Sequence, residues 1–203
     1  VLPGHGARVG EPLALHMDVD VLAFTGSTAT GARLLQYSGR SNLKRVWLEC
    51  GGKSPHVVFA DAPDLDAAAK AVARGIFFNQ GEVCTAGSRL LVQRSIREDF
   101  VHQVVAYGQH MQPRHPLDAD APMGALVDAA HLDKVRGDIV RAERSGARLL
   151  LGGHRADVEA GGCYVQPTVF DQVSPDQALA REEVFGPVLA VLGFDDEAEA
   201  VRL

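Results

Sequence analysis

The sequence is poor in cysteine, in long hydrophobic runs and in net positive charge, and each shortage excludes a class of protein. Its 203 residues include three widely spaced cysteines, Cys50, Cys84 and Cys163, with no Cys-X-X-Cys pair. This pattern fits neither a disulfide framework nor a zinc ligand set, so we expect free thiols, no metal site and a reducing, cytoplasmic setting. The longest hydrophobic runs, such as Pro187–Leu192, are far too short to span a bilayer.

Charge and composition narrow the range of partners. The net charge is −6 at pH 7, which gives no reason to expect nucleic acid or an anionic membrane as a partner. Hydrophobic residues make up 46% and charged residues 23%, an ordinary globular composition that predicts a buried core. No basic and apolar leader is seen in the opening "VLPGHG", which resembles the middle of a protein.

Short β-rich runs alternate with amphipathic helical runs along the chain. Strands are expected at 18–26, 44–49, 56–60, 88–93, 148–153, 164–170 and 187–194, and helices at 27–38, 64–78, 97–111, 130–146 and from 196 onward. This alternation predicts an α/β layered fold with a largely parallel sheet. The segment "ECGGKSP" (49–55) interrupts the pattern with two glycines and a proline, and it is the expected domain boundary.

The segment "FTGSTATG" (24–31) joins the end of a predicted strand to the start of a predicted helix. Ligands collect at the carboxyl ends of strands in α/β sheets, and the free N–H groups of a helix N-terminus suit a phosphate. Gly26 lets a diphosphate approach the backbone, and the Ser27 hydroxyl can add a hydrogen bond. The spacing matches neither the dinucleotide fingerprint nor a P-loop, so taken alone the segment favours an ordinary capped helix.

Glu49 and Cys84 are candidates for acid–base and nucleophilic chemistry. Glu49 ends a β-run in "LECGGKSP" (48–55), where partial desolvation would raise the pKa of its carboxyl group toward that of a base. Cys84 follows a helix in "FFNQGEVCTAG" (77–87), where nearby N–H groups can stabilise a thiolate and an oxyanion. Taken singly, a surface glutamate and a buried, inert cysteine are the favoured interpretations.

The segment "REEVFGPVL" (181–189) joins two carboxylates to an aromatic residue and a Gly-Pro turn before a strand. Glu183 can accept hydrogen bonds from ribose hydroxyls, and Phe185 can pack on a flat ring. Standing alone, the segment favours a solvated acidic helix end followed by a core phenylalanine.

These four segments occur together in this order, and in that combination the chain resembles the NAD(P)-dependent aldehyde dehydrogenase family from Val1 to Leu203. The family's signatures include "FTGSTxxG", "LELGGKSP", "FxNxGQxC" and "EEIFGPV", and each has a counterpart here. The resemblance implies an aldehyde-dehydrogenase-like three-layer α/β fold, with the end of a Rossmann-like cofactor domain at 1–49 and most of the catalytic domain at 50–203.

The resemblance also implies a covalent mechanism that oxidises an aldehyde to a carboxylic acid. Cys84 is the implied nucleophile, which forms a thiohemiacetal and then a thioester, and Glu49 is the implied base that activates the hydrolytic water. The segments "HPLD" (115–118) and "HLDKV" (131–135) lean toward the subgroup that acts on γ-glutamyl-γ-aminobutyraldehyde and related ω-amino aldehydes. The implied partner is therefore a small-molecule aldehyde, and the full-length enzyme is expected to be a homo-oligomer.

A site for NAD or NADP, with NAD preferred, follows from the same resemblance. The residues implied at the cofactor are Gly26 and Ser27 at the diphosphate, His131 and Glu183 at the nicotinamide ribose, and Phe185 and the backbone of Cys50 at the nicotinamide.

Two residues depart from the family pattern, and so does the length. Cys50 replaces the usual leucine after the base, and Glu82 replaces the common glutamine before the nucleophile. Family chains are longer and carry further parts of the cofactor site, the oxyanion hole and the substrate funnel. We therefore expect an internal fragment of such an enzyme, inactive by itself, or alternatively a non-catalytic remnant that only folds or self-associates.

Overall fold

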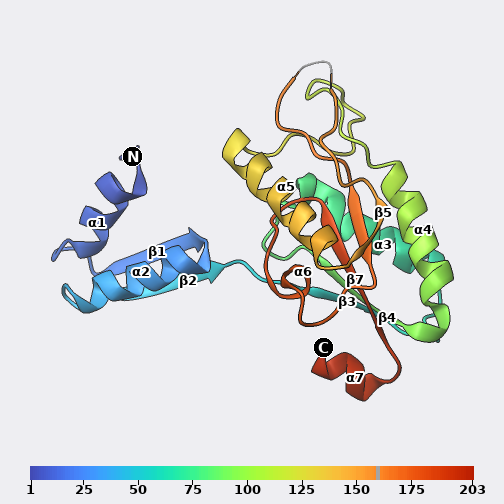
Figure 1. The fold of residues 1–203 in the computed structure, drawn as a ribbon. Helices are drawn as coiled ribbons and strands as arrows, with labels where there is room; N and C mark the ends of the chain where they lie inside the picture. Colours follow the sequence, from blue (N-terminus) through green and yellow to red (C-terminus); the bar gives the residue numbers. More distant parts are fainter. Residues whose placement is uncertain (159–160) are drawn as a thin grey trace. The chain divides into compact units, whose positions relative to one another are not determined.

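A computed structural model describes residues 1–158 and 161–203 (Figure 1). The chain divides into two compact units, Val1–Gly51 and Gly52–Leu203.

The smaller unit is a β-α-β element with a short helical lead. Two parallel strands, β1 (Val21–Gly26) and β2 (Arg45–Cys50), are joined by helix α2 (Thr28–Gly39). A five-residue π-helix (Gly6–Gly10) runs into α1 (Glu11–Leu15), and neither was predicted from the sequence. The strand predicted at 18–26 begins only at Val21.

Close packing joins α2 to β2 in the smaller unit. A Cβ atom on Gly31 would lie 3.1 Å from Leu48 Cδ1 and 3.2 Å from Cys50 Sγ, so the helix approaches the strand as closely as a glycine allows. Lys44, just before β2, is buried, and its Nζ donates to the carbonyl of Ala14 at 2.6 Å. That hydrogen bond satisfies a buried cation and ties α1 to the strand pair.

The larger unit contains a five-stranded sheet in the order β3-β4-β7-β6-β5. All neighbouring strands are parallel except β5, which pairs antiparallel with β6. The strands are β3 (Pro55–Val58), β4 (Arg89–Gln93), β5 (Arg148–Leu151), β6 (Thr168–Asp171) and β7 (Val188–Phe194). The helices are α3 (Leu65–Phe77), α4 (Arg97–Gln109), α5 (Ala129–Arg144), α6 (Ala178–Arg181) and α7 (Glu197–Arg202), with 3₁₀ turns at Phe78–Gly81 and Arg94–Ile96.

Helices cover both faces of this sheet. Helices α3 and α4 bury Ile76, Phe100 and Val104 against one face, together with Val191 of β7. Helices α5 and α6 cover the other face, where their side chains pack with Phe170 and with alternate residues of β7. Strand β7 is buried along nearly its whole length because both of its faces carry a core. The predicted three-layer α/β fold with a largely parallel sheet is confirmed.

Strand β6 also begins later than expected. The strand predicted at 164–170 begins at Thr168, because Pro167 has no N–H to donate to a ladder. Upstream, Val165 forms only an isolated bridge with Arg155. Helix α6 was also missed, because its four residues are too few to show a helical period.

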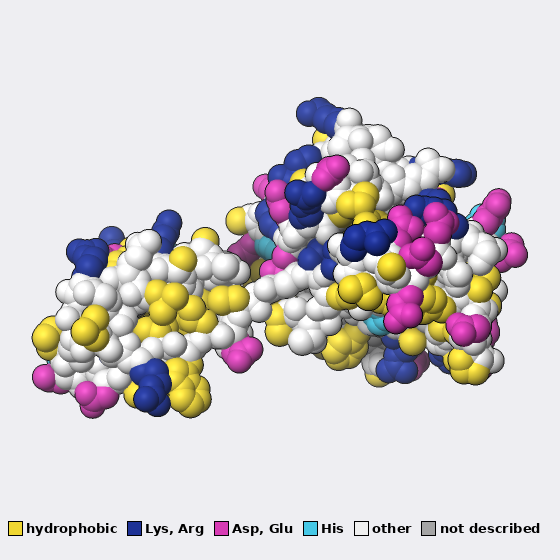
Figure 2. Space-filling view, turned by 90° about the horizontal axis from the view of Figure 1, so that it is seen from below, with side chains coloured by type: hydrophobic (Ala, Val, Ile, Leu, Met, Phe, Trp, Pro, Cys, Tyr) yellow, Lys and Arg dark blue, Asp and Glu magenta, His cyan; other side chains and the backbone are white. Residues whose placement is uncertain are grey.

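The surface carries charges of both signs. Figure 2 shows acidic and basic side chains interspersed over the larger unit, and hydrophobic side chains on the side of the smaller unit that faces the viewer. Exposed hydrophobic residues of the smaller unit include Met17, Val21, Leu35 and Trp47. Within the described residues, no helix is both long and apolar enough to cross a membrane.

Capping supports helix α3, which leads to Cys84. The Asp64 carboxylate accepts a hydrogen bond from the Ala67 N–H at 2.9 Å. We expect Asp64→Ala to lower the free energy of unfolding by about 1 kcal/mol, because an orphan N–H loses its acceptor. Urea unfolding followed by circular dichroism measures this loss. Lys70→Ala, at an exposed position of the same helix, is the control, and an equal loss in both variants contradicts the capping role.

Candidate active site

Cys84 lies at the tip of a tight turn that follows helix α3. The turn is closed by a hydrogen bond from the Ala86 N–H to the Val83 carbonyl at 3.0 Å. Cys84 is exposed, whereas Cys50 and Cys163 are half-buried, and all three thiols are free. This exposure contradicts the buried-filler interpretation and leaves the Cys84 sulfur accessible to a reagent.

An unusual backbone run holds this turn in place. Asn79, Gln80 and Gly81 all have positive φ, at 49°, 54° and 72°, and the first two are not glycines. Left-handed non-glycine residues are strained and need support from their surroundings. Asn79 supplies part of it, since its side-chain amide donates to the Glu82 carbonyl at 3.1 Å and its carbonyl accepts from the Glu82 N–H at 2.9 Å.

Gly81 brings residues 78–86, called the nucleophile loop after the predicted role of Cys84, against a second loop. A Cβ atom on Gly81 would lie 2.2 Å from the carbonyl oxygen of Gly186. The two backbones therefore touch where no side chain fits. Gly186 belongs to the "REEVFGPVL" segment. Within the larger unit, this contact therefore joins two of the four sequence motifs.

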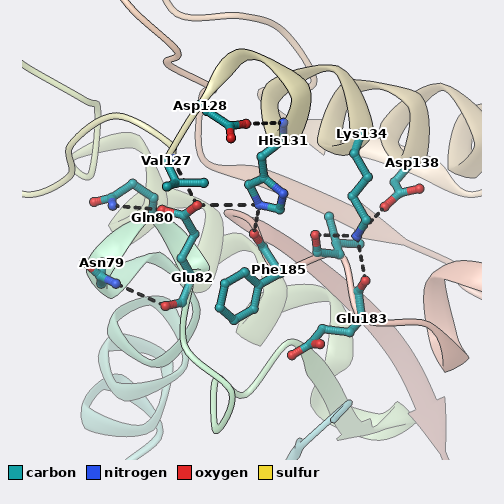
Figure 3. Close-up of polar contacts among 11 residues, drawn as sticks. Asn79, Gln80, Glu82, Val127, Asp128, His131, Lys134, Asp138, Glu183 and Phe185 are labelled. Atoms are coloured by element: carbon teal, nitrogen blue, oxygen red, sulfur yellow. Dashed lines mark hydrogen bonds and ion pairs between the residues drawn. The ribbon is translucent and has the colours of Figure 1, made fainter. Parts of the chain in front are cut away.

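The Glu82 side chain turns inward from the nucleophile loop (Figure 3). It is 11% exposed, and its Oε1 accepts a hydrogen bond from the Val127 N–H at 3.1 Å. The same oxygen lies 3.5 Å from His131 Nε2, while Oε2 accepts from the Gln80 amide at 3.4 Å. The residue that departs from the family pattern is therefore surrounded by donors.

His131 reaches the second loop from the first turn of α5. Its N–H is capped by Asp128 at 2.8 Å, and its Nε2 lies 2.6 Å from the Phe185 carbonyl oxygen. The His131 and Phe185 rings meet edge to face, with centroids 6.0 Å apart. Phe185 itself has a φ of 54°, so its strained backbone is held by this contact.

Lys134, one turn further along α5, anchors the same loop. Its Nζ donates to the carbonyls of Glu183 at 2.8 Å and Val184 at 2.7 Å, and it pairs with Asp138 at 3.1 Å. The Glu183 carboxylate accepts from the Gly52 N–H at 3.4 Å. Sequence reasoning did not assign Lys134, although its position three residues after His131 on a helix places both on one face.

The smaller unit gathers four other predicted site residues at one end of its strand pair. The parallel register sets Gly26 beside Cys50 and Thr25 beside Glu49. Ser27 caps α2, where its Oγ accepts from the Thr30 N–H at 3.2 Å. The Glu49 side chain projects from an exposed position. The strand ends and the helix N-terminus thus lie together, as a diphosphate site requires.

Lys53 is a further buried group that sequence reasoning missed. Its Nζ is buried and has no hydrogen-bond partner among the described residues. Burial, with help from the charges of Arg89 and Lys134, lowers the pKa of Lys53 to about 8. A lysine inside a Gly-Gly-Lys-Ser-Pro turn gave no sequence signal for burial. No cluster of three potential metal-ligating His, Cys, Asp or Glu side chains occurs in the part of the chain described by the structure.

The contact between the two loops predicts a sharp difference between two glycine substitutions. Gly81→Ala places a methyl group against the Gly186 carbonyl at a positive φ, so we expect a clear fall in melting temperature and lost protection of residues 78–86 from hydrogen exchange. Gly137→Ala, in the middle of α5 with open space around it, should stabilise the protein slightly. Equal melting temperatures for the two variants would contradict the close contact.

The Lys53 pKa predicts a pH dependence of stability. Between pH about 8 and the ordinary lysine pKa of 10.5, the unfolded chain binds more protons than the folded chain. The free energy of unfolding should therefore rise as the pH increases through this window, as the folded protein is relieved of a buried charge. Urea unfolding at several pH values measures the slope. In Lys53→Met the rise in the free energy of unfolding should be smaller, and an unchanged slope would contradict the lowered pKa of Lys53.

Comparison with known proteins gives consistent matches over the whole chain. The model of the aldehyde dehydrogenase family matches residues 1–203. The NADP/NAD-dependent aldehyde dehydrogenase PuuC of Escherichia coli is 50% identical over 203 residues, which are 100% of this chain and 40% of that protein. The chain therefore spans about 40% of the length of the curated relatives it matches.

Solved structures match equally well. An indole-3-acetaldehyde dehydrogenase mutant of P. syringae, in complex with NAD+ and IAA, has a TM-score of 0.97 and 54% identity, and the match covers 99% of this chain and 41% of that one. A γ-glutamyl-γ-aminobutyraldehyde dehydrogenase from Burkholderia cenocepacia has a TM-score of 0.95 and 55% identity, covering 99% and 40%. The chain belongs to the aldehyde dehydrogenase family.

Proposed function

We propose that an enzyme containing this chain oxidises an aldehyde to a carboxylic acid through a covalent intermediate on Cys84, with NAD(P)+ as cofactor. The observation that carries the proposal is the exposed Cys84 at the tip of a constrained turn, in a loop packed against the loop of Glu183 and Phe185. Membership of the aldehyde dehydrogenase family supports it. A structural cysteine would need neither this exposure nor this backbone strain.

The proposed chemistry begins at the sulfur. The Cys84 thiolate attacks the aldehyde carbonyl carbon, and the resulting oxyanion accepts a hydrogen bond from the Cys84 N–H. The thiohemiacetal carbon then loses a hydride and becomes a thioester. Glu49 takes a proton from water, which attacks the thioester carbonyl, and the acid leaves as the thiolate is regenerated.

The residues present fit a dinucleotide cofactor, which supplies the hydride acceptor when it is bound. Gly26 and Ser27 stand at a strand end and a helix N-terminus, and the first N–H groups of α2 have no acceptor within the helix. The nicotinamide half of the cofactor would contact the backbone of Cys50 and the residues His131, Glu183 and Phe185. We assign 1–49 to the cofactor domain and 50–203 to the catalytic domain. Of the two dinucleotides, NAD is the preferred cofactor.

The proposed substrate is an ω-amino or γ-glutamylamino aldehyde. Relatives named for such aldehydes support this choice: an aminoacetaldehyde dehydrogenase of Pseudomonas aeruginosa is 48% identical, and the Burkholderia structure bears the γ-glutamyl-γ-aminobutyraldehyde name. We further propose a cytoplasmic, homo-oligomeric full-length enzyme. The 203-residue chain alone should be inactive, because it spans about 40% of its relatives.

A chimera tests the proposed reaction. These 203 residues would replace the matching segment of the E. coli relative, whose sequence they match at 50% identity. We expect aldehyde-dependent NAD(P)H formation by the chimera, none by the 203-residue chain, and loss of turnover of at least about 100-fold in Cys84→Ala, because the covalent route is closed.

Cys163→Ala in the chimera is the matched control and should keep turnover. A folded chimera with no turnover, or one whose turnover survives Cys84→Ala, would contradict the proposal. If the chimera does not fold, alkylation of the 203-residue chain decides: Cys84 labelled no faster than Cys163 would exclude an accessible nucleophile.

A further inference from the structure

We propose that Glu82 and His131 form a positioning pair that ties the nucleophile loop to the loop of Phe185 and so fixes the placement of Cys84. The consequence of this pair for catalysis rests on the proposed function, whereas its effect on the loop does not. The pair lies entirely within the larger unit.

Glu82 is attached to its surroundings through both its backbone and its side chain. Asn79 makes two hydrogen bonds with the Glu82 backbone, one to the N–H and one to the carbonyl. The carboxylate reaches Val127, which precedes α5. Since Cys84 lies only two residues further on, the Glu82 contacts limit where the turn that carries Cys84 can go.

His131 is the link between the two loops. Its Nε2 faces two acceptors, the Phe185 carbonyl oxygen at 2.6 Å and Glu82 Oε1 at 3.5 Å (Figure 3). Because neither atom can donate, Nε2 must carry a proton. The single N–H of Nε2 is therefore directed at the Phe185 carbonyl oxygen, and the Glu82 carboxylate oxygen lies beside it. The imidazole is 17% exposed, which shields this interaction from water.

The surroundings of Glu82 select a carboxylate over an amide. Three donors face it: the Val127 N–H, His131 Nε2 and the Gln80 amide. A carboxylate only accepts, so it binds the Val127 and Gln80 donors and presents an oxygen to the Nε2–H that His131 gives to Phe185, whereas a glutamine would turn its NH₂ group toward at least one donor. Gln80 cannot flip to compensate, because its Oε1 accepts from the Gly124 N–H at 3.0 Å. Glu82 and His131 are thus matched to each other in donor and acceptor character.

This matching predicts a coupling between the two positions that two independent contacts would not show. Glu82→Gln should expose the 78–86 loop to hydrogen exchange about tenfold faster, because its NH₂ group then faces another donor. In a His131→Ala background the same substitution should speed exchange no more than about twofold, because the loop has already lost the contact that joins it to the Phe185 carbonyl. Hydrogen exchange of the 203-residue chain, resolved by mass spectrometry, measures both.

The control is Glu143→Gln, at an exposed position on α5, which should leave the loop unchanged. Unaltered exchange in Glu82→Gln, or a double variant whose effect is the sum of the two single effects, overturns the pair. In the chimera, Glu82→Gln should lower kcat several-fold with little change in the aldehyde KM. Unchanged kcat there overturns the positioning role, whereas a chimera without turnover, alongside confirmed coupling of the two substitutions, counts against the proposed function alone.

Discussion

The contact between the backbones of Gly81 and Gly186 is the constraint on which the candidate site of the larger unit depends. One loop follows helix α3 and carries Cys84, and the other precedes strand β7 and carries Glu183 and Phe185. They touch where any side chain at position 81 would collide with a carbonyl oxygen. The left-handed run at Asn79 and Gln80 is the geometric consequence, because the chain must leave α3 and still reach that contact.

Helix α5 converts this contact into a supported site. Gly186 lies against it so closely that a Cβ atom there would be 2.9 Å from Val135 Cγ2. From the same helix face, His131 and Lys134 bind carbonyl oxygens of the loop that precedes β7. A strained loop persists only when its surroundings over-determine it, and α5 supplies the donors that do so. The buried apolar side of α5, which includes Ile139, fixes the helix on the sheet.

The division of proposed roles between the two units has a simple chemical meaning. The smaller unit offers strand ends, a helix N-terminus and the Glu49 carboxylate, which are groups that bind a diphosphate and accept a proton. The larger unit offers the thiol and the strained loops around it. Covalent aldehyde oxidation needs all of these, so in the proposed enzyme neither unit suffices alone.

Much of this protein could be predicted from its sequence, because the informative signals are local. Hydrophobic periodicity indicated most helices and most strands, and four short motifs in order were sufficient for the family, which the comparison confirmed. The roles of Cys84 and Glu49 stay predictions that rest on those motifs. Prediction from the sequence failed where the signal was short or non-local. Helix α6 has only four residues, and β6 begins only at Thr168, after Pro167.

Only the tertiary structure decided which distant residues meet. Glu82 contacts Val127 and His131, and His131 contacts Phe185, across long stretches of chain that carry no local pairing signal. The burial of Lys53 and its lowered pKa likewise depend on neighbours brought in by folding. Local patterns determine helices, turns and motifs through backbone preferences, whereas partners and burial depend on packing between segments, and packing exists only in the folded chain.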